Sequence, residues 1–211
     1  MRMPVKNTKG FSLLELLVVV AIIGIISGVA YPNFSSWKKD REARVFTEKV
    51  ANLFSSISTS AQRGSYPYVQ VYFKFDQGTF KVYGKGMVQD SMTKLLNAGT
   101  ALNCSMVSAG YWTNHEIKII ESDQVALNIN SNSAVCFSQD SSYYKTMGNL
   151  SGENTMIICA KSLAALTGSC PTTASTGLTK NGVAQQAYLI EWNRFSNIVK
   201  KRWGVNGWTI Q

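Results

Sequence analysis

The sequence of residues 11–31 reads FSLLELLVVVAIIGIISGVAY, in which Glu15 is the only charged residue. No further charge follows before Lys38. A helix rises about 1.5 Å per residue, so about 20 such residues cross the hydrocarbon core of a bilayer. Basic residues precede the stretch, namely Arg2, Lys6 and Lys9. Because basic residues favour the cytoplasmic side, the pattern predicts a single transmembrane helix over residues 11–33, with the rest of the chain in the periplasm.

Three interpretations of this stretch are open. A secretory signal would be cleaved after its small residues, before Tyr31. A plain signal anchor would leave Glu15 unexplained. A carboxylate in a membrane helix costs about 3 kcal/mol and usually has a partner. A segment that assembles with copies of itself would explain Glu15, because a neighbouring copy could supply that partner. Cleavage between Gly10 and Phe11 would create a positive amine one helical turn before Glu15.

Residues 9–15, KGFSLLE, resemble the class III signal of type IV pilins and pseudopilins. The resemblance implies that residues 1–10 are a leader peptide, which a prepilin peptidase removes by cleavage after Gly10. It also implies that the same enzyme methylates the new N-terminal Phe11. In that family the equivalent of Glu15 directs the docking of a subunit into the filament.

The sequence after Pro32 has the period of an amphipathic helix. Its apolar residues recur mostly at steps of three and four, as one face of a helix requires; they are Phe34, Trp37, Phe46, Val50, Leu53, Phe54, Ile57 and Ala61. The charged residues within 38–49 fill the other face, which we interpret as a solvated surface. Gly64 suits the end of the helix. We therefore expect one helix over residues 11–63, whose amphipathic half, residues 34–64, packs on the head.

After the helix, apolar and polar residues alternate with a period of two, which is typical of strands. Residues 68–75 and 79–83 flank the turn signal DQG and predict a hairpin. The stretch Gly84-Lys85-Gly86 reads as the end of this hairpin. Further strands are expected at residues 116–121, 124–130, 134–138, 155–160, 187–193, 197–203 and 208–211.

Residues 139–153 and 161–184 are rich in Gly, Ser, Thr and Asn and read as loops. A helix followed by strands predicts an α+β fold, in which a long N-terminal helix packs on an antiparallel β head formed by residues 65–211. This layout resembles the type IV pilin-like fold, which the resemblance of residues 9–15 also implies. Within it, residues 50–64 and the closing stretch 187–203 resemble the GspH/FimT group.

The cysteines indicate disulfide bonds. An even number of cysteines in an exported chain favours pairing, and the chain has four: Cys104, Cys136, Cys159 and Cys170. Four cysteines allow three pairings. We favour Cys159 with Cys170, because they close a short loop, which leaves Cys104 with Cys136. Free buried thiols are the alternative.

No group of residues predicts catalysis. His115 is the only histidine, so a nucleophile–base pair could use only this residue. The nucleotide-binding and zinc-protease motifs are missing from the sequence, and the cysteines lack the tight spacing of a zinc site. The acidic residues around 116–123 are too sparse for a calcium loop. We expect no enzyme activity, no metal and no cofactor.

The C-terminal region combines basic residues with tryptophans in a chain of net charge +9. Basic side chains neutralise phosphates, and exposed aromatic rings stack on bases. By resemblance to FimT-like minor pilins, some of which receive DNA, the residues to consider for DNA contact are Arg194, Lys200, Lys201 and Arg202. The alternative is a terminal strand whose tryptophans, Trp192, Trp203 and Trp208, lie in the core while its lysines face water.

The resemblance implies a minor pilin, a non-catalytic structural subunit in type IV pilus assembly or initiation, with DNA uptake as an extension. Two alternatives stay open: a GspH-like pseudopilin of a type II secretion system, and a pilus-associated DNA receptor that acts through the basic C-terminus. The expected partners are other pilins or pseudopilins through the N-terminal helix, the prepilin peptidase, the inner membrane and, for the receptor, DNA. The expected location is the inner membrane, single-pass with a periplasmic head, and then the pilus or pseudopilus.

Overall fold

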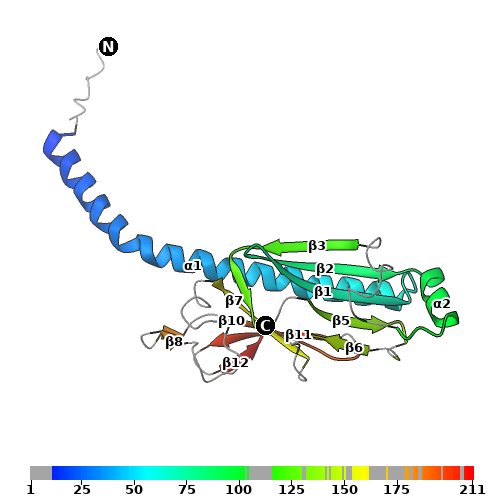
Figure 1. Cartoon of the computed structure of the whole chain (residues 1–211). Helices are drawn as coiled ribbons and strands as arrows, with labels where there is room; N and C mark the ends of the chain where they lie inside the picture. Colours follow the sequence, from blue (N-terminus) through cyan, green and yellow to red (C-terminus); the bar gives the residue numbers. More distant parts are fainter. Residues whose placement is uncertain are drawn as a thin grey trace, which may run out of the picture. The chain divides into compact units, whose positions relative to one another are not determined.

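The structure is a computed structural model, shown in Figure 1. It describes residues 11–102, 104, 116–129, 132–140, 142, 144–148, 150, 154–161, 170, 179–180, 183–184, 187–195, 197–204 and 207–211. The chain divides into two compact units, Met1–Lys38 and Lys39–Gln211. We call the second unit the head.

One long helix, α1, runs from Leu13 to Gln62 and contributes to both units. Its end is a Schellman motif. The N–H of Gly64 donates to the carbonyl oxygen of Ala61 at 2.9 Å, and the N–H of Ser65 donates to that of Ser60 at 3.0 Å. Gly64 has a φ of 73°, which a residue without Cβ adopts at little cost. The predicted long helix is therefore confirmed, and it ends where the glycine indicated.

The described part of the first unit is the apolar half of α1. The large apolar side chains between Leu13 and Ile26 are 47–83% exposed. No helix among the described residues combines the length and apolarity that crossing a membrane requires.

The head contains two antiparallel five-stranded sheets. Sheet A has the order β3-β2-β1-β5-β6, with strands β1 (Tyr68–Asp76), β2 (Thr79–Met87), β3 (Glu116–Ser122), β5 (Ser133–Ser138) and β6 (Tyr144–Met147). Sheet B has the order β12-β11-β10-β7-β4, with strands β4 (Val125–Leu127), β7 (Thr155–Ala160), β10 (Ala187–Trp192), β11 (Ile198–Gly204) and β12 (Gly207–Ile210). A small ribbon pairs β8 (Thr179–Lys180) with β9 (Val183–Ala184). The predicted α+β layout is confirmed.

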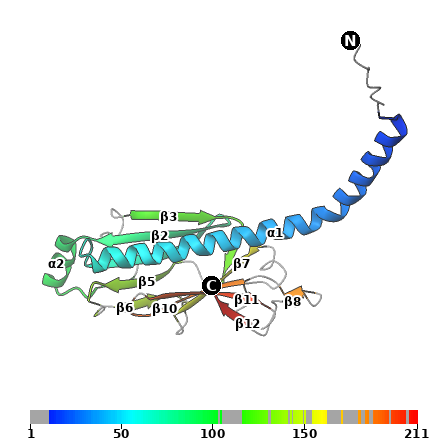
Figure 2. The same ribbon diagram turned by 180° about the vertical axis from the view of Figure 1, so that it is seen from behind.

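The head half of α1 is the centre of the main core. Figures 1 and 2 show it running along sheet A, with sheet B on its other side. Phe54 is 1% exposed, and its ring lies 5.3 Å from that of Trp192 in sheet B. The same ring lies 6.2 Å from Phe73 and 6.3 Å from Phe137, both in sheet A. One helical side chain thus contacts aromatic rings of both sheets.

Gly84 lets sheet A approach the helix. A Cβ atom on Gly84 would lie only 2.7 Å from the Cδ1 atom of Leu53 and 2.8 Å from that of Ile57. The expectation that Gly84-Lys85-Gly86 ends the hairpin was wrong, because β2 continues to Met87. Gly84 instead leaves room for the helix side chains, and Gly86 leaves room for the ring of Tyr66.

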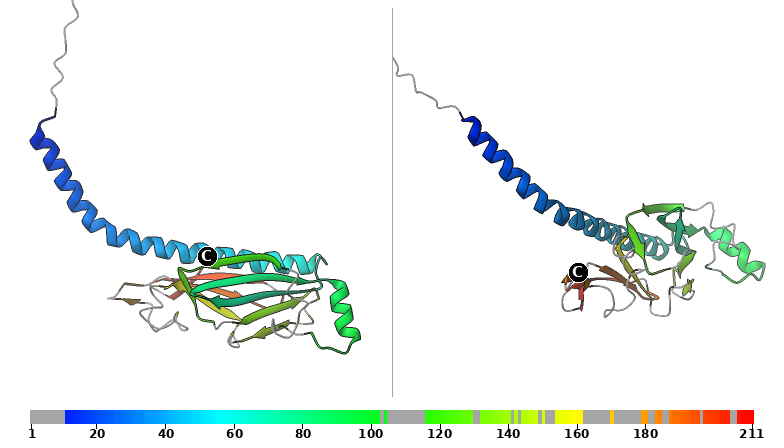
Figure 3. Two further views of the ribbon diagram at one scale, coloured as in Figure 1. Left: turned by 45° about the horizontal axis from the view of Figure 1, so that its top comes forward. Right: turned by 60° about the vertical axis from the view of Figure 1, so that its left-hand side comes forward.

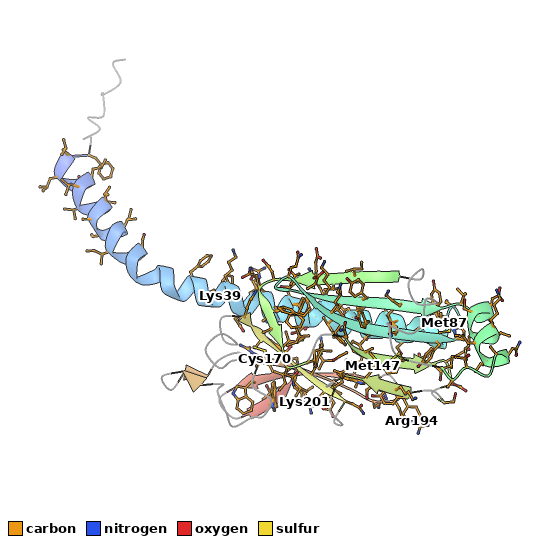
Figure 4. All side chains as sticks on the ribbon, in the orientation of Figure 1. Lys39, Met87, Met147, Cys170, Arg194 and Lys201 are labelled. Atoms are coloured by element: carbon orange, nitrogen blue, oxygen red, sulfur yellow. A yellow bond between two sulfur atoms is a disulfide. The ribbon has the colours of Figure 1, made fainter. Side chains whose placement is uncertain are left out.

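The outer face of sheet A carries a second, smaller core. Helix α2 (Gln89–Asn97) follows β2, and its Met92 and Leu95 pack against a cluster that includes Tyr68, Tyr72 and Met87. Figure 3 shows α2 at one end of sheet A, and Figure 4 shows Met87 near that end. The side-chain amide of Gln70 donates to the carbonyl oxygen of Cys104 at 2.6 Å and ties the segment after α2 to the sheet.

Three short strands lie where the sequence predicted loops. Strand β6 falls in residues 139–153 and pairs with β5 over four residue pairs. Strands β8 and β9 fall within or at the end of residues 161–184. The side chains of β6 are exposed or half-buried, so backbone pairing rather than an alternating pattern defines it.

We predict that Phe54→Ala lowers the free energy of unfolding by about 3–5 kcal/mol, because it leaves a cavity that neither sheet can fill alone. Ser55→Ala is the matched control; this neighbour is exposed, and its loss should stay within about 0.5 kcal/mol. Urea unfolding of the purified chain followed by circular dichroism measures both. Equal losses in the two variants would contradict the central role of Phe54.

Candidate functional site

The start of α1 is a capped helix end. The backbone N–H of Glu15 donates to the side-chain oxygen of Ser12 at 3.2 Å, which is the bond of an N-cap residue. Ser12 and Glu15 have the spacing of a capping box, in which a glutamate at the third helical position follows a capping serine. An acidic side chain is also favourable near the positive end of the helix dipole. The first turn therefore suits a glutamate at this position independently of any partner.

The predicted processing residues fall on both sides of the described boundary. Gly10 lies outside the described residues, whereas Phe11 is 81% exposed and precedes the helix. The carboxylate of Glu15 is exposed as well. The first half of α1, up to residue 28, is apolar on every face after this turn. Such a surface fits an environment of lipid or of other apolar helices.

A family comparison decides the class of this segment. Residues 5–31 match the family model described as the prokaryotic N-terminal methylation motif. The N-terminal segment of the chain therefore carries this methylation motif. The match includes Gly10, Phe11 and Glu15 and ends before the head begins.

The curated relatives of this chain are similar to it over a limited stretch. A fimbrial protein of Pseudomonas aeruginosa is 39% identical over 57 residues, which cover 27% of this chain and 34% of that protein. A fimbrial protein of Moraxella nonliquefaciens is 38% identical over 56 residues, or 26% of this chain and 36% of that protein. The chain thus spans about a third of the length of the curated relatives it matches. No solved structure gives a significant match.

The basic residues of the C-terminus do not share one face. Lys200 and Lys201 are neighbours on β11, so their side chains leave opposite faces of sheet B. Arg194 follows the end of β10, with its guanidinium 5.0 Å from the ring centre of Phe195. Figure 4 shows Arg194 and Lys201 at separate places on sheet B.

Both lysines are held by carboxylates. The ammonium nitrogen of Lys200 lies 2.5 Å from a carboxylate oxygen of Glu48 on α1, and that of Lys201 lies 2.6 Å from Glu191 on β10. In this geometry two of the four candidate cations neutralise acidic groups of the head. The pair between Lys200 and Glu48 also joins the C-terminal strands to the helix.

A second polar contact between α1 and sheet B lies one strand further in. The hydroxyl of Tyr188 on β10 donates to a carboxylate oxygen of Asp40 at 3.1 Å. Burial raises the pKa of Asp40, while this hydrogen bond and the charges of Arg202 and Arg44 oppose the shift. Burial also raises the pKa of Tyr188, and the carboxylate of Asp40 raises it further. We call these contacts, Tyr188 with Asp40 and Lys200 with Glu48, the polar seam.

The polar seam corrects the interpretation of residues 38–49 as a wholly solvated face. Asp40 and Glu48 are half-buried and each binds a residue of sheet B. Their spacing of eight positions places them on one side of the helix, two turns apart. That spacing was the signal in the sequence, but it could not identify the partners on β10 and β11.

The three tryptophans of the C-terminal region are packed. Trp192 is 2% exposed, stacks on Phe54 and donates from its indole N–H to the hydroxyl of Tyr144 at 3.0 Å. Trp203 and Trp208 form an edge-to-face pair at 5.4 Å and pack against a cluster around Cys159. These contacts agree with the alternative in which the tryptophans belong to the core.

Two disulfide bonds join the cysteine pairs that the sequence analysis favoured. Cys104 is bonded to Cys136 and Cys159 to Cys170, with Cα atoms 5.8 Å and 5.9 Å apart. The first bond holds the segment after α2 against β5, and the second holds residue 170 against β7. Disulfides of this kind form in oxidising compartments.

The described residues contain no group of three or more His, Cys, Asp or Glu side chains that could hold a metal ion. His115 and the other residues of 105–115 lie outside the described part of the chain.

We predict that Asp40→Asn changes how stability depends on pH. The raised pKa of Asp40 means that the folded chain binds this proton more tightly than the unfolded chain, so the wild type loses stability as pH rises through the raised pKa. Asparagine keeps an oxygen that accepts the hydrogen bond from Tyr188 and has no proton to lose. The variant should therefore gain stability relative to the wild type as pH rises from about 4 toward neutral.

Thermal unfolding of both proteins across this pH range measures the difference. A difference that stays constant with pH would show that Asp40 does not titrate as its environment indicates.

Proposed function

We propose that the chain is a minor pilin, a non-catalytic subunit that takes part in the initiation or assembly of a type IV pilus. The observation that supports this most strongly is the methylation motif over residues 5–31, placed at the start of a helix whose apolar side chains are exposed on all sides. Fimbrial proteins are among its relatives. A β head of two sheets and two disulfides suits an extracytoplasmic subunit.

In this proposal the chain is first an inner-membrane protein. In the sequence, Glu15 is the only charged residue of the stretch 11–31, and basic residues precede this stretch. This supports a single pass over residues 11–33, with the head in the periplasm. Other pilins then receive the same helix when the subunit enters the filament.

Processing by a prepilin peptidase is the first step of the proposed function. We predict that N-terminal sequencing and mass spectrometry of the mature chain show a start at Phe11, one methyl group heavier than the unmodified residue. The methylation motif covers this position, and Ser12, the next residue, caps the helix. A start at Tyr31 would instead identify the segment as an ordinary secretory signal and would overturn the proposal.

Glu15 is the proposed docking residue. We predict that Glu15→Ala and Glu15→Gln leave membrane insertion intact but sharply reduce incorporation into filaments, because both remove the charge that would pair with the N-terminal amine of a neighbouring subunit. The glutamine variant keeps a polar side chain and so separates the loss of charge from the loss of helix capping. Glu42→Ala, on the same helix, is the control and should assemble normally.

The measurement is the amount of the chain in sheared filaments relative to the amount in membranes. Incorporation of both Glu15 variants at the wild-type level would exclude the docking role.

A pseudopilin of a type II secretion system is the alternative that the same motif supports. Deletion of the gene separates the two, since loss of pili with normal secretion indicates a minor pilin and the reverse indicates a pseudopilin. We do not propose DNA contact through Lys200 and Lys201, because each lysine already neutralises a carboxylate of the head.

A further inference from the structure

One face of α1 changes character at the end of the apolar stretch. Phe34, Trp37 and Lys38 stand at positions i, i+3 and i+4, which lie on the same face of a helix. Phe34 is 60% exposed, Trp37 is 53% exposed, and their ring centres are 5.7 Å apart. Lys38 is also exposed. We call these three residues of the first unit the aromatic collar.

The position of the aromatic collar along the helix matches the thickness of a bilayer. Phe34 comes 21 positions after Leu13, the first residue of α1, which is about 31 Å along a helix. The hydrocarbon core of a bilayer is about 30 Å thick, and its headgroup layers add about 5–8 Å on each side. Trp37, one turn further on, therefore falls at the level of the headgroups.

The chemistry of the aromatic collar suits that level. Tryptophan is enriched where the hydrocarbon meets the headgroups, because its ring is apolar and its N–H binds polar groups. Lysine extends its charged end toward phosphates while its stem stays in apolar surroundings. Aromatic rings followed within one turn by a cation thus fit the surface of an anionic bilayer.

We infer that the aromatic collar binds the periplasmic headgroup layer of the inner membrane and sets the depth of the subunit before assembly. The ligand class is an anionic phospholipid surface. The inference rests on the proposed membrane insertion of residues 11–33. A neighbouring subunit is the other occupant that this face could have, and the experiment separates the two.

The experiment uses the full mature chain reconstituted in vesicles of phosphatidylcholine and phosphatidylglycerol. Brominated lipids quench tryptophan fluorescence at short range, so lipids with bromine near the headgroup or deep in the acyl chain report depth. The chain has five tryptophans, and Trp37→Phe identifies the contribution of the aromatic collar. Trp203→Phe, which changes a tryptophan packed in sheet B, is the matched control.

We expect bromine near the headgroup to quench one component of the fluorescence more strongly than deep bromine does. Trp37→Phe should abolish this component, and Trp203→Phe should leave it unchanged. Lys38→Glu should weaken it in vesicles with phosphatidylglycerol but not in vesicles of phosphatidylcholine alone.

Three outcomes would overturn the inference, and they are distinguishable. A chain that floats with the vesicles but shows no component dependent on Trp37 would exclude the aromatic collar while leaving membrane insertion intact. A chain that crosslinks to a second copy through this face at every dilution, with Trp37 shielded from bromine at either depth, would assign the face to a neighbouring subunit. A chain that does not float with the vesicles would overturn the proposed insertion itself.

Discussion

The burial of one face of α1 between two sheets is the constraint on which the head depends. Sheets A and B share no strand, and they pair only within themselves. What joins them is the main apolar cluster, to which α1 contributes residues from Ala43 to Ala61. Phe54 lies at its centre because its ring meets rings from both sheets. Burial of large apolar side chains contributes about 1.5–3 kcal/mol each, so this helix supplies much of the stability of the head.

Contact with the same helix explains why charged residues near the C-terminus are paired within the head. Sheet B covers the helix with β10 and β11, and these strands carry Tyr188 and Lys200 on the face toward α1. An unpaired charge at a half-buried contact is costly, so each carboxylate on this side of the helix has a partner. Lys200 and Lys201, two of the four basic residues that suggested a DNA surface, therefore have a structural use within the head. The net positive charge of the sequence thus overstates the charge that these two lysines offer to a ligand.

Patterns that are local in the sequence predicted the fold well. The helix, its glycine end and the hairpin around Gln77 and Gly78 depend on residues within a few positions of one another. Helix α2 and strand β6 were missed for the opposite reason. Helix α2 has no buried residue and no side-chain cap at Val88, and β6 exists because β5 lies beside it. The polar seam joins residues about 150 positions apart in the sequence, a pairing that no local pattern reveals.

The two halves of α1 show how one helix can meet two different requirements. In the head, apolar residues occupy one face, and the opposite face holds polar residues such as Asn52, Ser55 and Ser56. Before residue 29, apolar residues occupy every face of the helix. Since a single continuous helix contains both patterns, the change between them must mark a change of surroundings rather than a change of backbone. The aromatic rings of Phe34 and Trp37 stand in the interval between the patterns, where neither hydrocarbon nor a protein core is the expected surrounding. The environment that fits these two rings is an interface between apolar and polar material. The first charged residues after Glu15, Lys38 and Lys39, follow directly after Trp37.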